Sequence, residues 1–116
     1  MSTPTEGYCL RIYIGESDKK DGMPLHEWLV GKAKGCGIAG ATVFRGTLGF
    51  GAHSHIRSAK LFDLSVDLPI VVEIVDEKEK LDAFMAIVDI NVEEGLATMQ
   101  KVEVHFYRAR KGKSQG

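Results

Sequence analysis

One short segment gathers residue types that bind anions and metals: it reads GTLGFGAHSH and covers residues 46–55. Its glycines carry no side chain, so that neighbouring backbone N–H groups can closely approach an anion such as a phosphate. The glycines concerned are Gly46, Gly49 and Gly51. The segment therefore offers an anion-binding loop, with a flexible hairpin loop as the alternative.

The same segment carries His53 and His55, two residues apart. In an extended chain this spacing places both imidazoles on one side, where they could bind a transition metal together with Asp63 or Asp67. The spacing is not that of a closed zinc site, and the cysteines lie elsewhere in the sequence. Three roles stay open: exposed loop side chains, contacts to a nucleotide or another anion, and metal ligands.

Basic side chains near the end of the chain form a second candidate for anion binding. Arg108 and Arg110 are two residues apart, and Lys101 begins the strand on which we expect them. On an extended strand both guanidinium groups would project to the same side, a geometry suited to binding a phosphate through charge-assisted hydrogen bonds. A basic tail without a ligand is the alternative.

The sequence carries no motif for nucleophilic or acid–base catalysis. It has no GxSxG motif, and neither Cys9 nor Cys36 lies beside a recognisable histidine and acid. Acidic pairs such as Glu93 and Glu94 fall at expected helix ends and loops, where solvated caps explain them. The two cysteines have no zinc or redox spacing, which indicates reduced thiols. We therefore predict no catalytic residues and a protein that is not an enzyme.

Composition and charge restrict the class of protein. The chain has 116 residues, of which 44% are hydrophobic and 27% charged, as is typical of one soluble globular domain. A net charge of −1 gives no overall attraction to nucleic acid or to anionic lipid. No run approaches the ~20 apolar residues that a bilayer span requires. We expect no nucleic-acid partner, no membrane insertion and a cytoplasmic location.

Four strands and two helices must position the candidate residues. Alternating apolar and polar residues, or short apolar runs, predict strands at 8–15, 41–45, 68–75 and 101–108. Helical spacing predicts one helix that starts at Pro24. A second helix is expected after Asp76, whose carboxylate would form a capping box with Glu79.

The order strand, helix, strand, strand, helix, strand predicts an α+β, ferredoxin-like βαββαβ fold, with a four-stranded antiparallel sheet and two helices on one face. Tyr8 and Tyr13 are assigned to the other face, where their rings favour cover by another subunit. We expect residues 1–7 to be a flexible leader, 8–110 a single domain with a mobile loop at about 47–64, and 111–116 a basic tail.

Two segments resemble the PII signal-transduction superfamily: GIAGATVFRGTLGFG at residues 37–51 and DLPIVVEIVD at residues 67–76. Members of that superfamily carry a G-x-T-V strand that runs into a GFG loop, and a later apolar strand that ends in a capped helix. The sequence is most similar to a branch of small uncharacterised PII-like proteins of bacteria and archaea.

The resemblance implies a non-enzymatic homotrimer that binds an adenine nucleotide in clefts between subunits. The mobile loop would be the T-loop, which contacts a regulated protein such as a membrane transporter. The implied nucleotide-binding residues are Thr42, Gly49, Phe50, Gly51, Gly95, Lys101, Arg108 and Arg110. The candidate ligands are AMP, ADP, ATP and a cyclic nucleotide.

The sequence departs from the PII pattern in three places. No tyrosine lies between Thr47 and Pro69, so that the tyrosine uridylylated in many PII proteins has no counterpart. Ala52 and His53 replace the arginine and glutamine that commonly follow GFG. The link VEEGLATMQK also lacks the glycine-rich phosphate pattern, which leaves AMP, ADP, a cyclic nucleotide or no nucleotide as the alternatives to a triphosphate.

Two alternative functions use the same scaffold. One is a divalent-metal-binding trimer similar to the cation-tolerance proteins, in which His53 and His55 would be the ligands. The other is a small ferredoxin-like enzyme. The fold cannot separate these alternatives, because one scaffold serves many functions.

Overall fold

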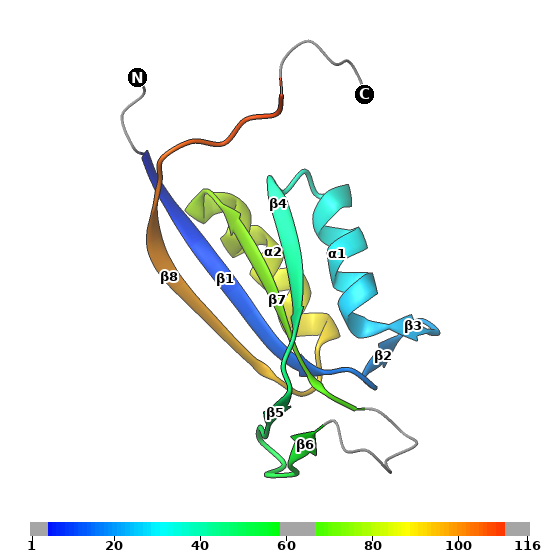
Figure 1. Cartoon of the computed structure of the whole chain (residues 1–116). Coiled ribbons are helices and arrows are strands. Elements are labelled where there is room, and N and C mark those ends of the chain that lie inside the picture. Colours follow the sequence, from blue (N-terminus) through cyan, green and yellow to red (C-terminus); the bar gives the residue numbers. More distant parts are fainter. Residues whose placement is uncertain (1–4, 59–66, 111–116) are drawn as a thin grey trace.

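The computed structural model describes residues 5–58 and 67–110. Four strands form one antiparallel sheet, and two helices cover one of its faces (Figure 1). The strands are β1 (Thr5–Gly15), β4 (Gly40–Arg45), β7 (Pro69–Asp76) and β8 (Leu96–Val104), in the spatial order β4-β7-β1-β8. The helices are α1 (Leu25–Gly35) and α2 (Lys78–Asn91). The predicted ferredoxin-like fold is confirmed.

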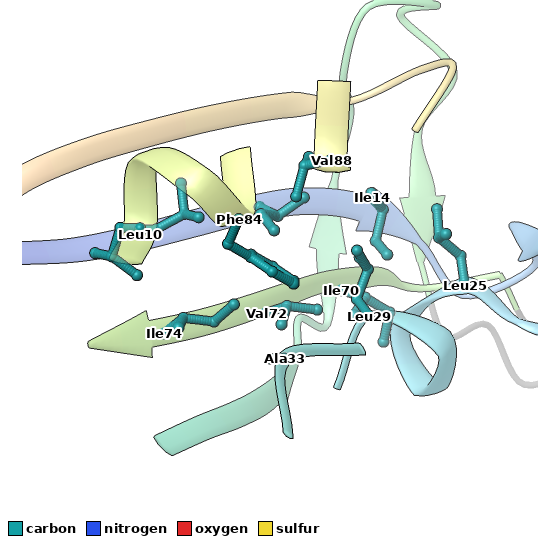
Figure 2. Packing of buried hydrophobic residues seen from close by; sticks show 12 residues of the cluster. Leu10, Ile14, Leu25, Leu29, Ala33, Ile70, Val72, Ile74, Phe84 and Val88 are labelled. Carbon is teal, nitrogen blue, oxygen red and sulfur yellow. The ribbon is translucent and has the colours of Figure 1, made fainter. Parts of the chain in front are cut away.

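The hydrophobic core lies between the helices and the two central strands, as Figure 2 shows. Each of these four elements contributes three buried side chains, spaced by two residues in the strands and by three or four in the helices. The twelve residues are Leu10, Ile12, Ile14, Leu25, Leu29, Ala33, Ile70, Val72, Ile74, Leu81, Phe84 and Val88. The predicted apolar faces of both strands and both helices are therefore those that pack.

Two strands have boundaries that differ from the predicted ones. β1 starts at Thr5, so that residues 5–7, which we had placed in the leader, belong to the sheet. β8 spans Leu96–Val104 instead of 101–108, because it pairs with β1 from Tyr13 back to Thr5. Residues 105–110 form no strand. The rest of the predicted leader and the tail at 111–116 lie outside the described residues.

Both helices start later than predicted. Pro24 precedes α1 instead of beginning it. Asp76 forms no capping box with Glu79, because it pairs with Tyr8 as the last residue of β7. Its carboxylate accepts hydrogen bonds from the backbone N–H groups of Ala39, at 2.8 Å, and Glu77, at 2.7 Å. Asp76 therefore fastens the chain before β4 to the end of β7.

The two tyrosines that we assigned to the open face lie on opposite faces of β1. They are five residues apart, and an odd separation turns two side chains of a strand to opposite sides. Tyr8 is half-buried and packs against the core, whereas Tyr13 is 38% exposed on the open face. The prediction is confirmed for Tyr13 and wrong for Tyr8.

Two short hairpins complete the described fold. β2 (Lys19–Lys20) pairs with β3 (Met23–Pro24), and β5 (Leu48–Gly49) pairs with β6 (Arg57–Ser58). The second hairpin falls within the predicted mobile loop and projects beyond the end of the sheet (Figure 1). Residues 59–64 of that loop lie outside the described residues. Neither described helix is both long and apolar enough to cross a membrane.

Candidate functional site

A single polar row crosses the open face of the sheet. The strand register places four residues side by side in the order β4, β7, β1, β8: Thr42, Glu73, Arg11 and Thr98. The next row toward the loop is apolar and consists of Phe44, Val71, Tyr13 and Leu96. The polar row therefore lies beside a hydrophobic strip, of which Phe44 is 50% and Leu96 57% exposed.

An ion pair occupies the centre of the polar row. The Nε of Arg11 donates to Oε2 of Glu73 at 2.9 Å, and its Nη1 donates to Oε1 of Gln100 at 3.3 Å. The hydrogen bond to Glu73 raises the pKa of Arg11. Burial, and then the negative charge of Glu73, raises the pKa of the Cys9 thiol. Cys9 and the exposed Cys36 are free thiols.

A cavity of about 420 Å³ opens at one end of the sheet, where β1 and β4 begin and β7 ends. Residues 39–42 and Val75 form much of its wall, and these are mostly small or apolar. Glu73, Asp76 and Tyr107 add polar groups to the wall. Thr42 is the one residue implied by the PII resemblance that lines it.

The chain after β8 crosses this end of the sheet toward β4 (Figure 1). The hydroxyl of Tyr107 donates to the carbonyl oxygen of Ala39 at 2.6 Å, and the residue forms part of the cavity wall. The guanidinium of Arg108 stacks on the ring of Phe106, 4.2 Å from its centre. The prediction that Arg108 and Arg110 share one face of a strand is wrong, because β8 ends at Val104.

The eight implied nucleotide-binding residues form two groups within the chain. The group toward the cavity end of the sheet consists of Thr42, Lys101, Arg108 and Arg110. The group at the loop end consists of Gly49, Phe50, Gly51 and Gly95. Gly95 lies so close to the carbonyl oxygen of Tyr13 that an added Cβ would be 2.6 Å from it. Lys101 pairs with Tyr8, which is five residues or about 16 Å along β1 from Tyr13, at ~3.3 Å per residue. One subunit therefore keeps Lys101 away from Gly95, whereas Thr42 lies in the row next to that of Tyr13.

The sequence-based prediction missed most of the cavity wall, including Glu73, Asp76 and Tyr107. Glu73 had a signal, since it is the one charged residue in the apolar run LPIVVEIV. Asp76 was assigned to a helix cap and Tyr107 to a strand. Their roles depend on the meeting of β4, β7 and the segment after β8, which no local pattern reveals.

The hairpin of the loop is anchored to the sheet through Arg57. Its guanidinium lies directly against Gly15, where an added Cβ would overlap Nη1. Nη1 is also 3.4 Å from Oδ1 of Asp67, which accepts a hydrogen bond from the backbone N–H of Ser17 at 3.0 Å. Only glycine leaves room for this arrangement at position 15.

The histidine pair does not assemble a metal site in the part of the chain that the structure describes. Nε2 of His53 lies 3.0 Å from Oε1 of Glu94 in the link between α2 and β8. Within residues 5–58 and 67–110, no three His, Cys, Asp or Glu side chains converge as metal ligands would. Asp63, a predicted partner, lies outside those residues.

Comparison with protein families and curated proteins identifies relatives over most of the chain. The model of the DUF190 family (Uncharacterized ACR, COG1993) matches residues 7–104. A UPF0166 protein of Aquifex aeolicus is 43% identical over 97 residues, which cover 84% of this chain and 91% of that protein. A UPF0166 protein of Methanocaldococcus jannaschii is 37% identical over 73 residues, which cover 63% of this chain and 67% of that protein.

Solved structures of PII-like proteins share the fold. CPII of Thiomonas intermedia K12, a nitrogen regulatory PII-like protein bound to ADP, AMP and bicarbonate, has a TM-score of 0.61 at 17% identity. The match covers 88% of this chain and 91% of that one. A proposed PII-like signalling protein of Thermus thermophilus has a TM-score of 0.66 at 16% identity. The match covers 89% of this chain and 93% of that one. The predicted resemblance to PII-like proteins is confirmed.

Proposed function

The chain belongs to the DUF190 family, and we propose that it is a non-enzymatic PII-like regulator that binds an adenine nucleotide between subunits. It signals to a partner protein through the loop that follows β4. The observation that carries this proposal is the cavity of about 420 Å³ beside Thr42, within the usual size range of small-molecule pockets. The bound ADP and AMP of CPII, which shares the fold, support an adenine nucleotide as the ligand.

The walls of the cavity suit the base and sugar of a nucleotide. Val75 and the small residues at 39–41 offer a slot of mainly apolar character, and the Thr42 hydroxyl and Glu73 carboxylate offer hydrogen-bond partners. The described wall contains four acidic side chains and no Lys or Arg: the four are Glu6, Glu73, Asp76 and Glu77. Like charges repel, so that the phosphates point away from this wall.

A neighbouring subunit supplies the phosphate contacts in this proposal. The apolar row on the open face, which includes Phe44 and Tyr13, gives the subunits a reason to associate as a homotrimer. Association can place the loop glycines and Gly95 of one subunit beside the cavity of the next. The two groups of implied residues, of which Lys101 and Gly95 are distant within one chain, would then meet around one nucleotide.

The β5–β6 hairpin offers the surface for the regulated protein. It carries three large apolar side chains that are at least 62% exposed: Leu48, Phe50 and Ile56. A nucleotide that contacts the glycines at its base could change the order of the hairpin, and a partner such as a membrane transporter could detect that change. A metal-binding trimer is the second candidate, supported by the contact between His53 and Glu94.

Calorimetric titration of AMP, ADP, ATP and cyclic AMP tests the proposal. We expect at least one of the four to bind the wild type with a dissociation constant well below about 1 mM. Thr42→Val should weaken that binding, because it removes a hydroxyl from the cavity wall. Thr98→Val, at the other end of the polar row, should leave it unchanged. The proposal fails if none of the four nucleotides binds.

A further inference from the structure

Glu73 lines two neighbouring hollows of the sheet. It lines the cavity beside Thr42, and it also lines a second hollow of about 420 Å³ on the open face, between β1, β7 and β8. Its side chain is 28% exposed. A carboxylate placed in this way can accept hydrogen bonds from a ligand on one side and from the sheet on the other.

Arg11 holds the Glu73 carboxylate from the neighbouring strand β1. It lies opposite Glu73 in the register of β1 and β7, and its Nε donates to Oε2 at 2.9 Å. The amide oxygen of Gln100, 3.3 Å from Nη1, holds the same guanidinium from the side of β8. Arg11 itself is not among the described residues of the cavity wall. Its effect on a ligand would therefore pass through Glu73.

We infer that Arg11 is a positioning residue, which holds the Glu73 carboxylate at the cavity wall to accept a hydrogen bond from the nucleotide. The donor is either the amino group of the base or a hydroxyl of the ribose. Thr42 is the neighbour of Glu73 on β4, so that its hydroxyl stands beside the same carboxylate in the polar row. This inference rests on the proposed function and names the acceptor that gives the site its selectivity.

The test compares three nucleotides by calorimetry: AMP, purine riboside 5′-monophosphate, which lacks the amino group, and 2′-deoxy-AMP, which lacks one ribose hydroxyl. The wild type should prefer AMP to one of the two analogues by about tenfold, the usual effect of a hydrogen bond to a charged group. Arg11→Met and Glu73→Gln should each weaken AMP binding by about tenfold and abolish the preference. Arg11→Lys, which keeps the charge, should retain part of the AMP affinity and part of the preference for AMP.

Asp82→Asn is the matched control. It also converts a carboxylate to an amide in an ion pair, with Lys78 at 2.8 Å, but on the exposed surface of α2. AMP affinity and preference should both stay at the wild-type values. Light scattering on every variant shows whether the subunits remain associated. If the subunits of Arg11→Met dissociate, the nucleotide affinities of Arg11→Lys and Glu73→Gln decide whether the inference holds.

If Arg11 had a purely structural role, Arg11→Met would weaken the binding of all three nucleotides in equal proportion and preserve the preference for AMP. That result overturns the inference and leaves the proposed function standing, as does wild-type binding of AMP by Arg11→Met. A wild type that binds AMP without preferring it to either analogue also overturns only the inference. If the wild type binds none of the three nucleotides, the inference fails, and the nucleotide-binding proposal fails with it only if ADP, ATP and cyclic AMP do not bind either.

Discussion

The hydroxyl of Tyr107 donates to the carbonyl oxygen of Ala39 at 2.6 Å and thereby fastens the segment after β8 to the chain just before β4. Tyr107→Phe removes this bond but keeps the ring in the cavity wall. We expect the free energy of unfolding to fall by about 0.5–1.5 kcal/mol, the net value of one hydrogen bond. Trypsin should also cleave after Arg108 faster, because the segment is released more often. Cleavage at the wild-type rate would show that the bond does not hold the segment.

A substitution at Gly15 tests whether Arg57 anchors the β5–β6 hairpin to the sheet. Gly15→Ala places a Cβ where the Arg57 guanidinium lies, so that the guanidinium must move away and Asp67 loses its ion-pair partner. Hydrogen exchange of residues 47–58 should become faster, as it should in Arg57→Ala. The double variant should add little, because both changes remove the same contact.

Gly31→Ala is the control for that substitution. Gly31 lies exposed in α1, and an added Cβ would have nothing within 4 Å. Alanine should raise the free energy of unfolding by about 0.5–1 kcal/mol there, owing to its higher helix propensity. Hydrogen exchange in the loop should stay at the wild-type rate.

If the effects of Gly15→Ala and Arg57→Ala on hydrogen exchange in the loop were additive, they would contradict a common anchor.

The apolar row of the open face tests assembly. Phe44 is 50% exposed on that face, and Phe44→Asp introduces a charge that would be buried between subunits. Light scattering should show a trimer for the wild type and dissociation for this variant. Leu48→Asp, on the β5–β6 hairpin, should remain trimeric. A monomeric wild type at micromolar concentration would exclude the proposed assembly.

The Cys9 thiol predicts a pH dependence of stability. Its pKa is raised above the ordinary value of 9.0, chiefly by burial, so that the folded state retains the proton at a pH where the unfolded state releases it. Stability due to this thiol is therefore complete below pH 9.0 and declines as the pH rises above it. Denaturant unfolding of Cys9→Val should lack this decline, whereas Cys36→Ala should retain it. The same decline in Cys9→Val would assign it to other groups.

Local patterns predicted most of the fold because they report on burial. Alternation in YCLRIYIG and helical spacing around Phe84 each select the face that packs, and both faces are buried as expected. The limits of β8 were wrong because a partner strand sets them: the stretch that reads as a link, from Leu96 onward, pairs with β1 from Tyr13.

The candidate site was less predictable for the same reason. Thr42 follows from a motif, and it lines the cavity. Glu73 and Tyr107 join it only through strand register and through a segment that returns across the sheet. Within one chain, Lys101 lies about 16 Å along β1 from Tyr13, which Gly95 contacts, so that the proposal needs association to bring the two groups around one ligand.

Mixing two defective variants tests a nucleotide site between subunits most directly. Glu73→Gln with Thr42→Val weakens the cavity, and Gly51→Val places a side chain where a phosphate would approach the loop backbone, so that neither variant should bind AMP with wild-type affinity when pure. If one subunit supplies the cavity and the next supplies the loop, random trimers from equal amounts should recover about a quarter of the wild-type sites. Calorimetry on the refolded mixture should therefore show wild-type affinity at about a quarter of the stoichiometry. No recovered binding, from a mixture shown to contain mixed trimers, would contradict a site shared between subunits.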